Sequence, residues 1–168
     1  MKELSPELET RIQQAVENFM AGYGCCQSVV AAFADIYGLD RDLALRIAAG
    51  FGAGVGRLRM MCGAVSGIVA LTGLQCGSTD GSDREGKANC YAIVRQLLEK
   101  FKERNTSIIC AEILANSKCL PATDSYVPDK RNAQYYKTRP CARKVESAAR
   151  IFAEYLAETG EKKNTDKQ

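Results

Sequence analysis

The sequence contains no histidine among its 168 residues. This absence excludes catalytic sites of the Ser-His-Asp and Cys-His types, because each of them needs an imidazole. It also excludes zinc sites with histidine ligands and the C-x-x-C-H motif that attaches haem. Any metal site in this chain must therefore be built from sulfur and oxygen ligands.

An excess of charge of either sign is also missing. The chain has 23 basic and 20 acidic residues, which gives a net charge of +3. Because a DNA-binding domain normally carries a strong basic excess on one face, we expect no nucleic acid partner. The first residues, Met-Lys-Glu-Leu-Ser-Pro-Glu, are charged and lack the apolar core of a secretory signal. We therefore expect a cytoplasmic protein.

Long apolar segments are scarce as well. Residues 60–79 carry no acidic or basic side chain and, at about 20 residues, approach the length that crosses a bilayer. The same segment holds several glycines and polar residues, which give it a weak hydropathy signal. We expect a buried central helix there and no membrane span. With 46% hydrophobic and 26% charged residues, the composition is that of an ordinary globular protein.

Helical spacing of apolar residues, together with helix start signals, predicts an all-α fold. We expect a single-domain bundle of about six to seven helices over residues 1–160, followed by a polar C-terminal tail over 161–168. We find no convincing strand pattern and no internal repeat. Helix starts are expected at or near seven residues: Ser5, Cys25, Asp40, Cys62, Asp83, Thr106 and Pro140.

Several details of this bundle can be predicted. The second helix should run to Tyr37 and end at Gly38, and the last helix should end at Gly160. The third helix should turn Leu43, Ile47 and Ala48 inward. Glycines interrupt regular structure over residues 50–56, and residues 115–138 form the longest irregular stretch, a candidate for a covering segment.

Eight cysteines are the richest source of chemistry in the chain. In a reducing compartment they are not expected to form a static disulfide framework, so metal binding, redox cycling or simple burial must explain them. Four of them fall in the first turn of four different expected helices: Cys25, Cys62, Cys110 and Cys141. A helix N-terminus favours thiolate over thiol and lowers the pKa of a cysteine.

This placement is compatible with more than one kind of site. Four converging thiolates suit an iron-sulfur cluster or tetrahedral zinc, whereas two neighbouring thiolates suit a reversible disulfide. Each cysteine could instead fill a gap in the core as a small hydrophobic residue. Spacing does not decide, because there is no C-x-x-C and the intervals are much longer than those of familiar metal motifs. Of the other four cysteines, Cys26, Cys76, Cys90 and Cys119, we expect most to be structural. Cys26 belongs to the apolar stripe of its helix but could also capture a soft metal ion together with Cys25. Cys119 is the expected extra participant and could serve as a resolving thiol.

The glycine-rich segment and the basic residues near the cysteines carry weaker signals. Residues 50–57 lack the lysine and Ser/Thr of a P-loop, so we interpret them as a close turn near Cys62. Arg57 and Arg59 would then add positive charge beside the Cys62 thiol. Tyr135 and its basic neighbours form a basic, aromatic patch before Cys141, which we interpret as part of a covering loop.

Four segments of the chain resemble a known family. They are Gly-Tyr-Gly-Cys at residues 22–25, the glycine-rich segment 50–57, Cys-Gly-Ala-Val-Ser-Gly at residues 62–67, and the pair Cys110 and Cys141. In these segments the chain is similar to the C_GCAxxG_C_C family of putative redox-active proteins over residues 12–156, and every fixed position of the CGAxxG motif is met.

The resemblance implies a redox or electron-transfer role for Cys25, Cys62, Cys110 and Cys141. Members are often encoded near transporter genes, and a related module occurs in split-Soret cytochromes, where an iron-sulfur site has been considered. Haem binding does not carry over, because this chain lacks histidine.

Three functions remain open from the sequence, and with them the question whether the protein is an enzyme. The first is electron transfer by an iron-sulfur or other soft-metal site on the four cysteines, serving an unidentified redox partner. The second is a metal-free thiol-disulfide oxidoreductase. The third is a zinc-stabilised accessory or binding module linked to a transporter. The sequence also leaves open whether the chain forms a homo-oligomer.

Overall fold

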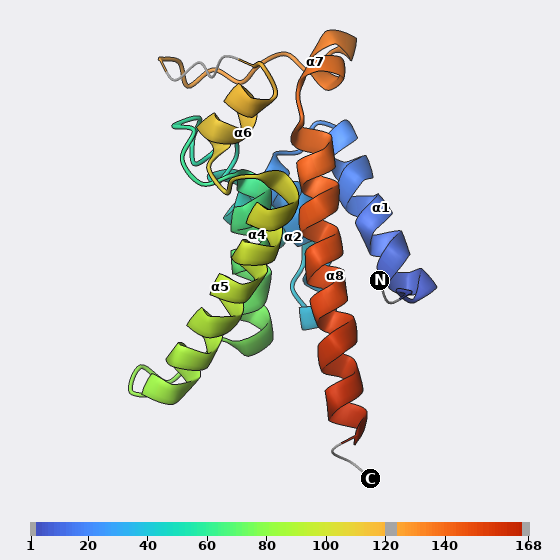
Figure 1. Cartoon of the computed structure of the whole chain (residues 1–168), viewed down its shortest axis with the longest axis vertical. Helices are drawn as coiled ribbons and strands as arrows, with labels where there is room; N and C mark the ends of the chain where they lie inside the picture. Colours follow the sequence, from blue (N-terminus) through green and yellow to red (C-terminus); the bar gives the residue numbers. More distant parts are fainter. Residues whose placement is uncertain (1–2, 120–123, 166–168) are drawn as a thin grey trace.

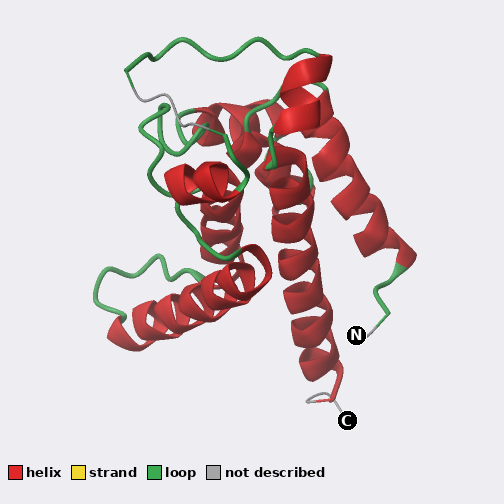
Figure 2. Ribbon diagram, turned by 45° about the horizontal axis from the view of Figure 1, so that its top comes forward, coloured by secondary structure: helices red, strands yellow, loops and turns green. Residues whose placement is uncertain are grey.

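The computed structural model describes residues 3–119 and 124–165 (Figures 1 and 2). Within these ranges the chain forms eight α-helices and one 3-10 helix, with no strand beyond an isolated bridge between Met61 and Ile109. The elements are α1 (Pro6–Met20), α2 (Cys25–Ala31), η1 (Ala34–Tyr37), α3 (Arg41–Ala49), α4 (Gly63–Cys76), α5 (Arg84–Asn105), α6 (Cys110–Asn116), α7 (Ala133–Thr138) and α8 (Cys141–Thr165). The all-α prediction is confirmed, with one helix more than the upper expected number.

Three helices begin where their capping residues predict. The side-chain oxygens of Ser5, Asp40 and Asp83 accept hydrogen bonds from backbone N–H groups in the first turns of α1, α3 and α5. Such a bond satisfies a donor that has no partner within its own helix. These three start signals can therefore be read from local sequence alone.

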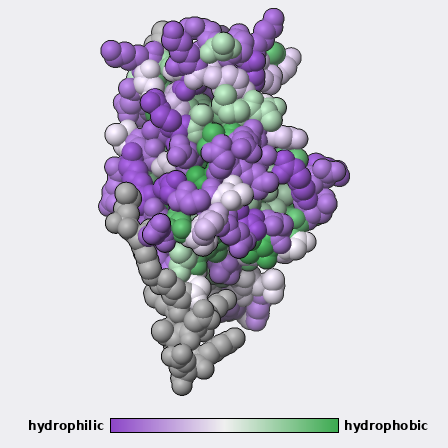
Figure 3. Space-filling model, turned by 90° about the vertical axis from the view of Figure 1, so that its right-hand side faces the viewer, coloured by the Kyte–Doolittle hydropathy of each residue, from purple (hydrophilic) through white to green (hydrophobic). Residues whose placement is uncertain are grey.

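Helix α4 lies at the centre of the bundle and packs against α2, α5 and α8, while α1 runs beside α8 (Figure 1). Most of the first half of α4 is buried. In the same core, the rings of Phe33 and Phe152 pack edge to face, with their centroids 5.3 Å apart. The prediction of a buried central helix is confirmed. Within the described ranges, no helix combines the length and the apolar character needed to cross a membrane. On the face shown in Figure 3, hydrophilic residues predominate and hydrophobic ones show between them.

Two glycines of α4 set its distance from α2. A Cβ atom at Gly67 would lie 2.8 Å from Cβ of Val29, and a Cβ atom at Gly63 would lie 3.1 Å from Cβ of Cys25. Carbon atoms in contact normally stay about 3.5–4.0 Å apart, so only glycine allows this approach. The two fixed glycines of CGAxxG therefore bring the start of α4, at Cys62, next to the start of α2, at Cys25.

Five details of the predicted bundle are wrong. Helix α6 begins at Cys110 and not at Thr106 or Ser107, and α7 forms inside the stretch 115–138 that was expected to be irregular. Helix α2 ends at Ala31, and the expected continuation to Tyr37 is the separate turn η1. Leu43 and Ile47 are 45% and 56% exposed, because α3 lies against α2 with its alanine face, Ala44 and Ala48, which permits a closer approach. Helix α8 passes Gly160 and ends at Thr165, since one glycine inside a helix costs only about 1 kcal/mol.

Candidate functional site

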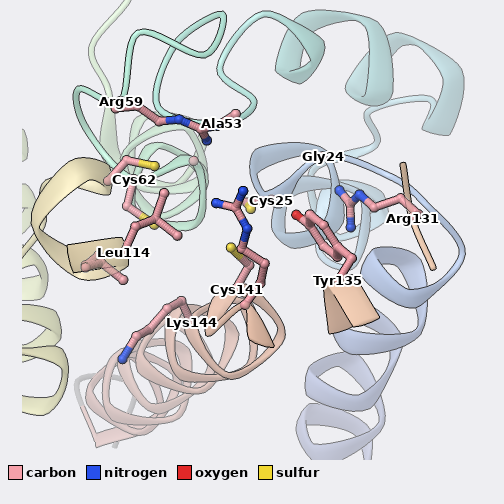
Figure 4. Close-up of a pocket in the computed structure, with 14 residues that line it drawn as sticks. Gly24, Cys25, Ala53, Arg59, Cys62, Leu114, Arg131, Tyr135, Cys141 and Lys144 are labelled. Carbon is pink, nitrogen blue, oxygen red and sulfur yellow. The ribbon is translucent and has the colours of Figure 1, made fainter. Parts of the chain in front are cut away.

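All four predicted site cysteines line one cavity of about 60 Å³ (Figure 4). Cys25, Cys110 and Cys141 are the first residues of α2, α6 and α8, and Cys62 is the N-cap of α4. Four helix starts from distant parts of the chain therefore meet at one place. In Figure 4, Tyr135 and Arg131 lie on one side of this cavity and Lys144 on another. We call it the thiol pocket.

Cys25 and Cys141 form the more accessible pair of the thiol pocket. Their side chains are hydrogen-bonded to each other, and both residues are half-buried. The hydrogen bond from Cys25, followed by the charges of Arg139 and Arg131, lowers the pKa of Cys141 to about 7. The same bond, together with burial, raises the pKa of Cys25 well above its usual value. Cys141 is therefore the thiolate of the pair, and Cys25 is its proton-bearing partner.

Cys62 and Cys110 are buried, and neither favours the thiolate. Burial raises the pKa of Cys62 to about 12, although the N–H groups of Ala64 and Val65 act in the opposite direction. Burial also raises the pKa of Cys110, against the charge and hydrogen bond of Arg59. The expectation that all four helix starts favour thiolate is therefore wrong for three of them. Loss of solvation outweighs the partial charge of the helix end.

The thiol pocket is electropositive. Of the described residues that line it, four carry positive charge and none is acidic: Arg59, Arg131, Arg139 and Lys144. Arg131 is held between aromatic rings, with its guanidinium carbon 4.3 Å from the ring centroid of Phe19 and 4.6 Å from that of Tyr135. Its Nη2 donates to the carbonyl of Tyr23, whereas its buried Nη1 has no hydrogen-bond partner among the described residues.

Asp129 organises the arginines at the edge of the thiol pocket. Its carboxylate accepts a hydrogen bond of 2.9 Å from Nη2 of Arg139 and lies 3.2 Å from Nη1 of Arg57. Arg59 lies near the same carboxylate, at 3.9 Å. Arg57 and Arg59 were expected to add positive charge beside Cys62. Arg59 lines the thiol pocket together with Cys62, and its charge and hydrogen bond act on Cys110.

The segment before α8 covers the thiol pocket. Arg131 and Tyr135 line the cavity, and the hydroxyl of Tyr136 donates to the carbonyl of Met20, 3.1 Å away. Of residues 124–138, only Arg131 and Tyr135 line the cavity, so the covering role predicted for this segment applies to these two residues, and residues 120–123 lie outside the described ranges. Sequence reasoning missed Lys144, although its position one helical turn after Cys141 is a signal that could have found it.

A strained segment closes another side of the pocket. Residues 53–57 all have positive φ, including Ala53 at 53° and Val55 at 63°. A left-handed conformation costs roughly 1–2 kcal/mol for each non-glycine residue, and a β-branched residue is a true outlier there. The turn is held by hydrogen bonds such as that from the N–H of Met60 to the carbonyl of Gly54. A Cβ atom at Gly54 would lie 2.7 Å from Cβ of Cys110, so the strained turn packs directly on a site cysteine.

Cys119 does not line the thiol pocket. Its sulfur is hydrogen-bonded to the carbonyl of Thr138, 3.2 Å away. Cys26 is fully buried in the core, in agreement with its predicted structural role. Cys76 and Cys90 lie together elsewhere, which the sequence did not suggest. The thiol pocket therefore contains only the four predicted cysteines.

The ligand types in the thiol pocket suit a soft metal, but their arrangement does not. Four thiols are the ligands that zinc and iron-sulfur clusters prefer. Among residues 3–119 and 124–165, however, no three cysteine or acidic side chains form a group that could hold a metal ion. The cysteines would have to move closer together to bind one.

The lowered pKa of Cys141 leads to a first prediction. Because only the thiolate reacts, the rate of alkylation of Cys141 by iodoacetamide should rise with pH and reach half its maximum near pH 7. Replacing Arg139 with glutamine should move this midpoint upward, because a charge that favours the thiolate is lost. Lys137→Gln, on the exposed side of α7, is the matched control and should leave the midpoint unchanged.

Labelling at Cys141 is quantified by mass spectrometry of the peptide that contains it. A midpoint near the ordinary cysteine value of about 8.5 would contradict the geometry described above.

Comparison with known protein families supports the predicted resemblance. The sequence model of one family, described as "Putative redox-active protein (C_GCAxxG_C_C)", matches residues 23–155. Comparisons with curated proteins and with solved structures gave no match. The matched range covers most of the chain and includes all four cysteines of the thiol pocket. The chain therefore belongs to the C_GCAxxG_C_C family of redox-active proteins.

Proposed function

We propose that this protein is a thiol-disulfide oxidoreductase in which Cys141 attacks a disulfide and Cys25 resolves the product. One observation carries the proposal: the two thiols are hydrogen-bonded, and the pKa of Cys141 is lowered to about 7. An attacking thiol works best when its pKa lies near the ambient pH, because it is then both ionised and nucleophilic. Both residues are also partly accessible, unlike Cys62 and Cys110.

The proposed reaction has two exchange steps. The Cys141 thiolate attacks one sulfur of the substrate disulfide, forms a mixed disulfide and releases the first thiolate. Cys25 then loses its proton to that leaving group and attacks the sulfur of Cys141, which releases the second thiolate into solvent, where it takes up a proton. Two electrons pass from the cysteine pair to the substrate, and the protein is left with a disulfide between Cys25 and Cys141. A dithiol reductant would return it to the starting state.

The charge of the thiol pocket indicates the class of substrate. Four cationic side chains line a cavity with room for only a small group, and Nη1 of Arg131 has no hydrogen-bond partner in the part of the chain that the structure describes. A small disulfide that carries carboxylates fits this environment, and the arginines would also stabilise the departing thiolate.

Substrate charge can be tested with two small disulfides of similar size. We expect dithiodiglycolate, a dianion, to oxidise the protein at least about 10-fold faster than cystamine, a dication, at low ionic strength. The ratio should shrink in about 0.5 M salt, because salt screens the attraction. The readout is the loss of protein thiols over time, measured after the small thiols have been removed. Equal rates for the two disulfides would remove the argument for an anionic substrate.

A second candidate function is a soft-metal or iron-sulfur site, which would supply electron transfer. It is supported by the four thiols that line one cavity, and its ligands would be Cys25, Cys62, Cys110 and Cys141. A zinc-stabilised accessory module linked to a transporter would use the same ligands. Both require the sulfurs to approach one another more closely than they do here.

Metal and sulfide content separates these candidates. On protein purified without oxygen, we expect no bound metal and the loss of two thiols for each equivalent of dithiodiglycolate consumed. Iron with acid-labile sulfide that disappears in Cys62→Ser would establish the cluster instead. Zinc whose chelation unfolds the chain would establish the accessory module.

A further inference from the structure

A second pair of thiols lies at the other end of α4. Cys76 is the last residue of that helix, and Cys90 lies in the second turn of α5, which packs against α4. The Cys76 thiol donates to the carbonyl of Thr72 in its own helix, 3.2 Å away, and its sulfur lies close enough to Cys90 for the two side chains to interact. Both residues are half-buried. The family pattern uses neither of them, and a core role does not require two thiols to meet.

This pair is separate from the thiol pocket. Cys76 is hydrogen-bonded to the hydroxyl of Tyr155, on α8. Tyr155 follows Cys141 by about four helical turns, which places the two residues about 21 Å apart along the helix. The two pairs of thiols therefore cannot exchange directly within one molecule.

We propose that Cys76 and Cys90 form an intramolecular disulfide when the protein meets a low-molecular-weight disulfide of the glutathione type. The bond would join the end of α4 to the start of α5 and close the polar loop between them, residues 77–83. The pair would thus act as a redox-controlled staple of the α4–α5 hairpin, independent of the chemistry proposed for Cys25 and Cys141.

The external disulfide is the oxidant that accepts the two electrons from Cys76 and Cys90. Burial, together with the interaction with Cys90, raises the pKa of Cys76 to about 11, so Cys76 carries little thiolate at neutral pH. Cys90 is therefore the attacking group, and it releases one thiol as the mixed disulfide forms. Cys76 then attacks the sulfur of Cys90 and releases the second thiol. Two protein thiols are oxidised, and one external disulfide is reduced to two thiols.

The staple should make the protein more stable. A cross-link across a loop of about 15 residues restricts the unfolded chain, and for a protein of this size the gain corresponds to a rise in Tm of roughly 6–12 °C. No rise is expected in Cys90→Ser, because that variant lacks the attacking thiol. The shift should persist in Cys141→Ser, so that failure of the reaction proposed for the thiol pocket leaves this result intact.

The bond itself can be mapped on the full chain. The protein is reduced, exposed to oxidised glutathione, alkylated and digested with trypsin, which places the two cysteines on peptides 60–84 and 88–95. We expect these peptides to be linked. Because Cys62 shares the first peptide with Cys76, the link must persist in Cys62→Ser and disappear in Cys76→Ser.

Three results would contradict the proposed disulfide between Cys76 and Cys90. The first is that both Cys76 and Cys90 stay open to alkylation after oxidation. The second is a glutathione adduct on Cys90 that persists without conversion to the linked peptides. The third is a link that disappears in Cys62→Ser.

Discussion

Replacing Cys141 with serine should lower the second-order rate constant for oxidation by dithiodiglycolate by about 100-fold or more. A serine hydroxyl is not ionised at neutral pH and does not attack disulfides, whereas Cys141 has a pKa of about 7. The other cysteines of the thiol pocket cannot replace it, because the pKa values of Cys25, Cys62 and Cys110 are all raised. The comparison is made in a Cys90→Ser background, which removes the second pair of thiols from the reaction. The rate is followed by the appearance of released thioglycolate.

Two further variants test whether Cys141 acts in the first of the two exchange steps. In Cys25→Ser, Cys141 should still attack the disulfide, but the reaction should stop at a mixed disulfide that mass spectrometry detects. Cys119→Ser is the matched control and should react at the rate of the unaltered protein, because Cys119 does not line the thiol pocket. A Cys141→Ser protein that keeps most of its rate would show that another thiol attacks.

Replacing Gly67 with valine should have the largest effect on folding, a loss of about 3 kcal/mol or more of the free energy of unfolding. The first added carbon would lie 2.8 Å from Cβ of Val29, inside the closest contact of α4 with α2. The two helices would have to separate, which would also disturb the thiol pocket at their common end. Thermal unfolding should show a fall in Tm of roughly 6–12 °C.

Gly73→Val on the same helix is the matched control. A Cβ atom at Gly73 meets nothing within 4 Å, so only the small difference in helix propensity between glycine and valine remains. Its Tm should stay close to that of the unaltered protein. If both valine variants unfolded at the same temperature, the second glycine of CGAxxG would not be needed for close packing of α4 on α2.

Local signals predicted much of the fold. The caps at Ser5, Asp40 and Asp83 act within one helical turn, so they can be read from a short window. The inward face of α3 could not be read in the same way. Leu43 and Ile47 share a helical period with each other, but the alanine face is the one that fits against α2, and the choice depends on a neighbour distant in sequence.

Only part of the candidate site could be predicted, because some of its features depend on local sequence and others on how the helices pack. The position of each cysteine near a helix start is a local signal, and α2, α4 and α8 start where the sequence places them, whereas α6 begins at Cys110 itself and not at Thr106. Which cysteines pair is not local, because Cys25 and Cys141 come from opposite ends of the chain. Burial, which decides the pKa values of Cys62 and Cys110, arises only when the helices pack. The pair Cys76 and Cys90 depends in the same way on how α5 folds back on α4.

Disulfide mapping after oxidation by one equivalent of dithiodiglycolate tests the central claim most directly. A Cys26→Ala/Cys90→Ser protein is the suitable background, because Cys26 would otherwise share a tryptic peptide with Cys25 and Cys90 would react independently. In it we expect one new bond, between Cys25 and Cys141, with Cys62 and Cys110 still present as free thiols. A bond that involves Cys62 or Cys110, or no bond between Cys25 and Cys141, would contradict the assignment of this pair as the reacting thiols.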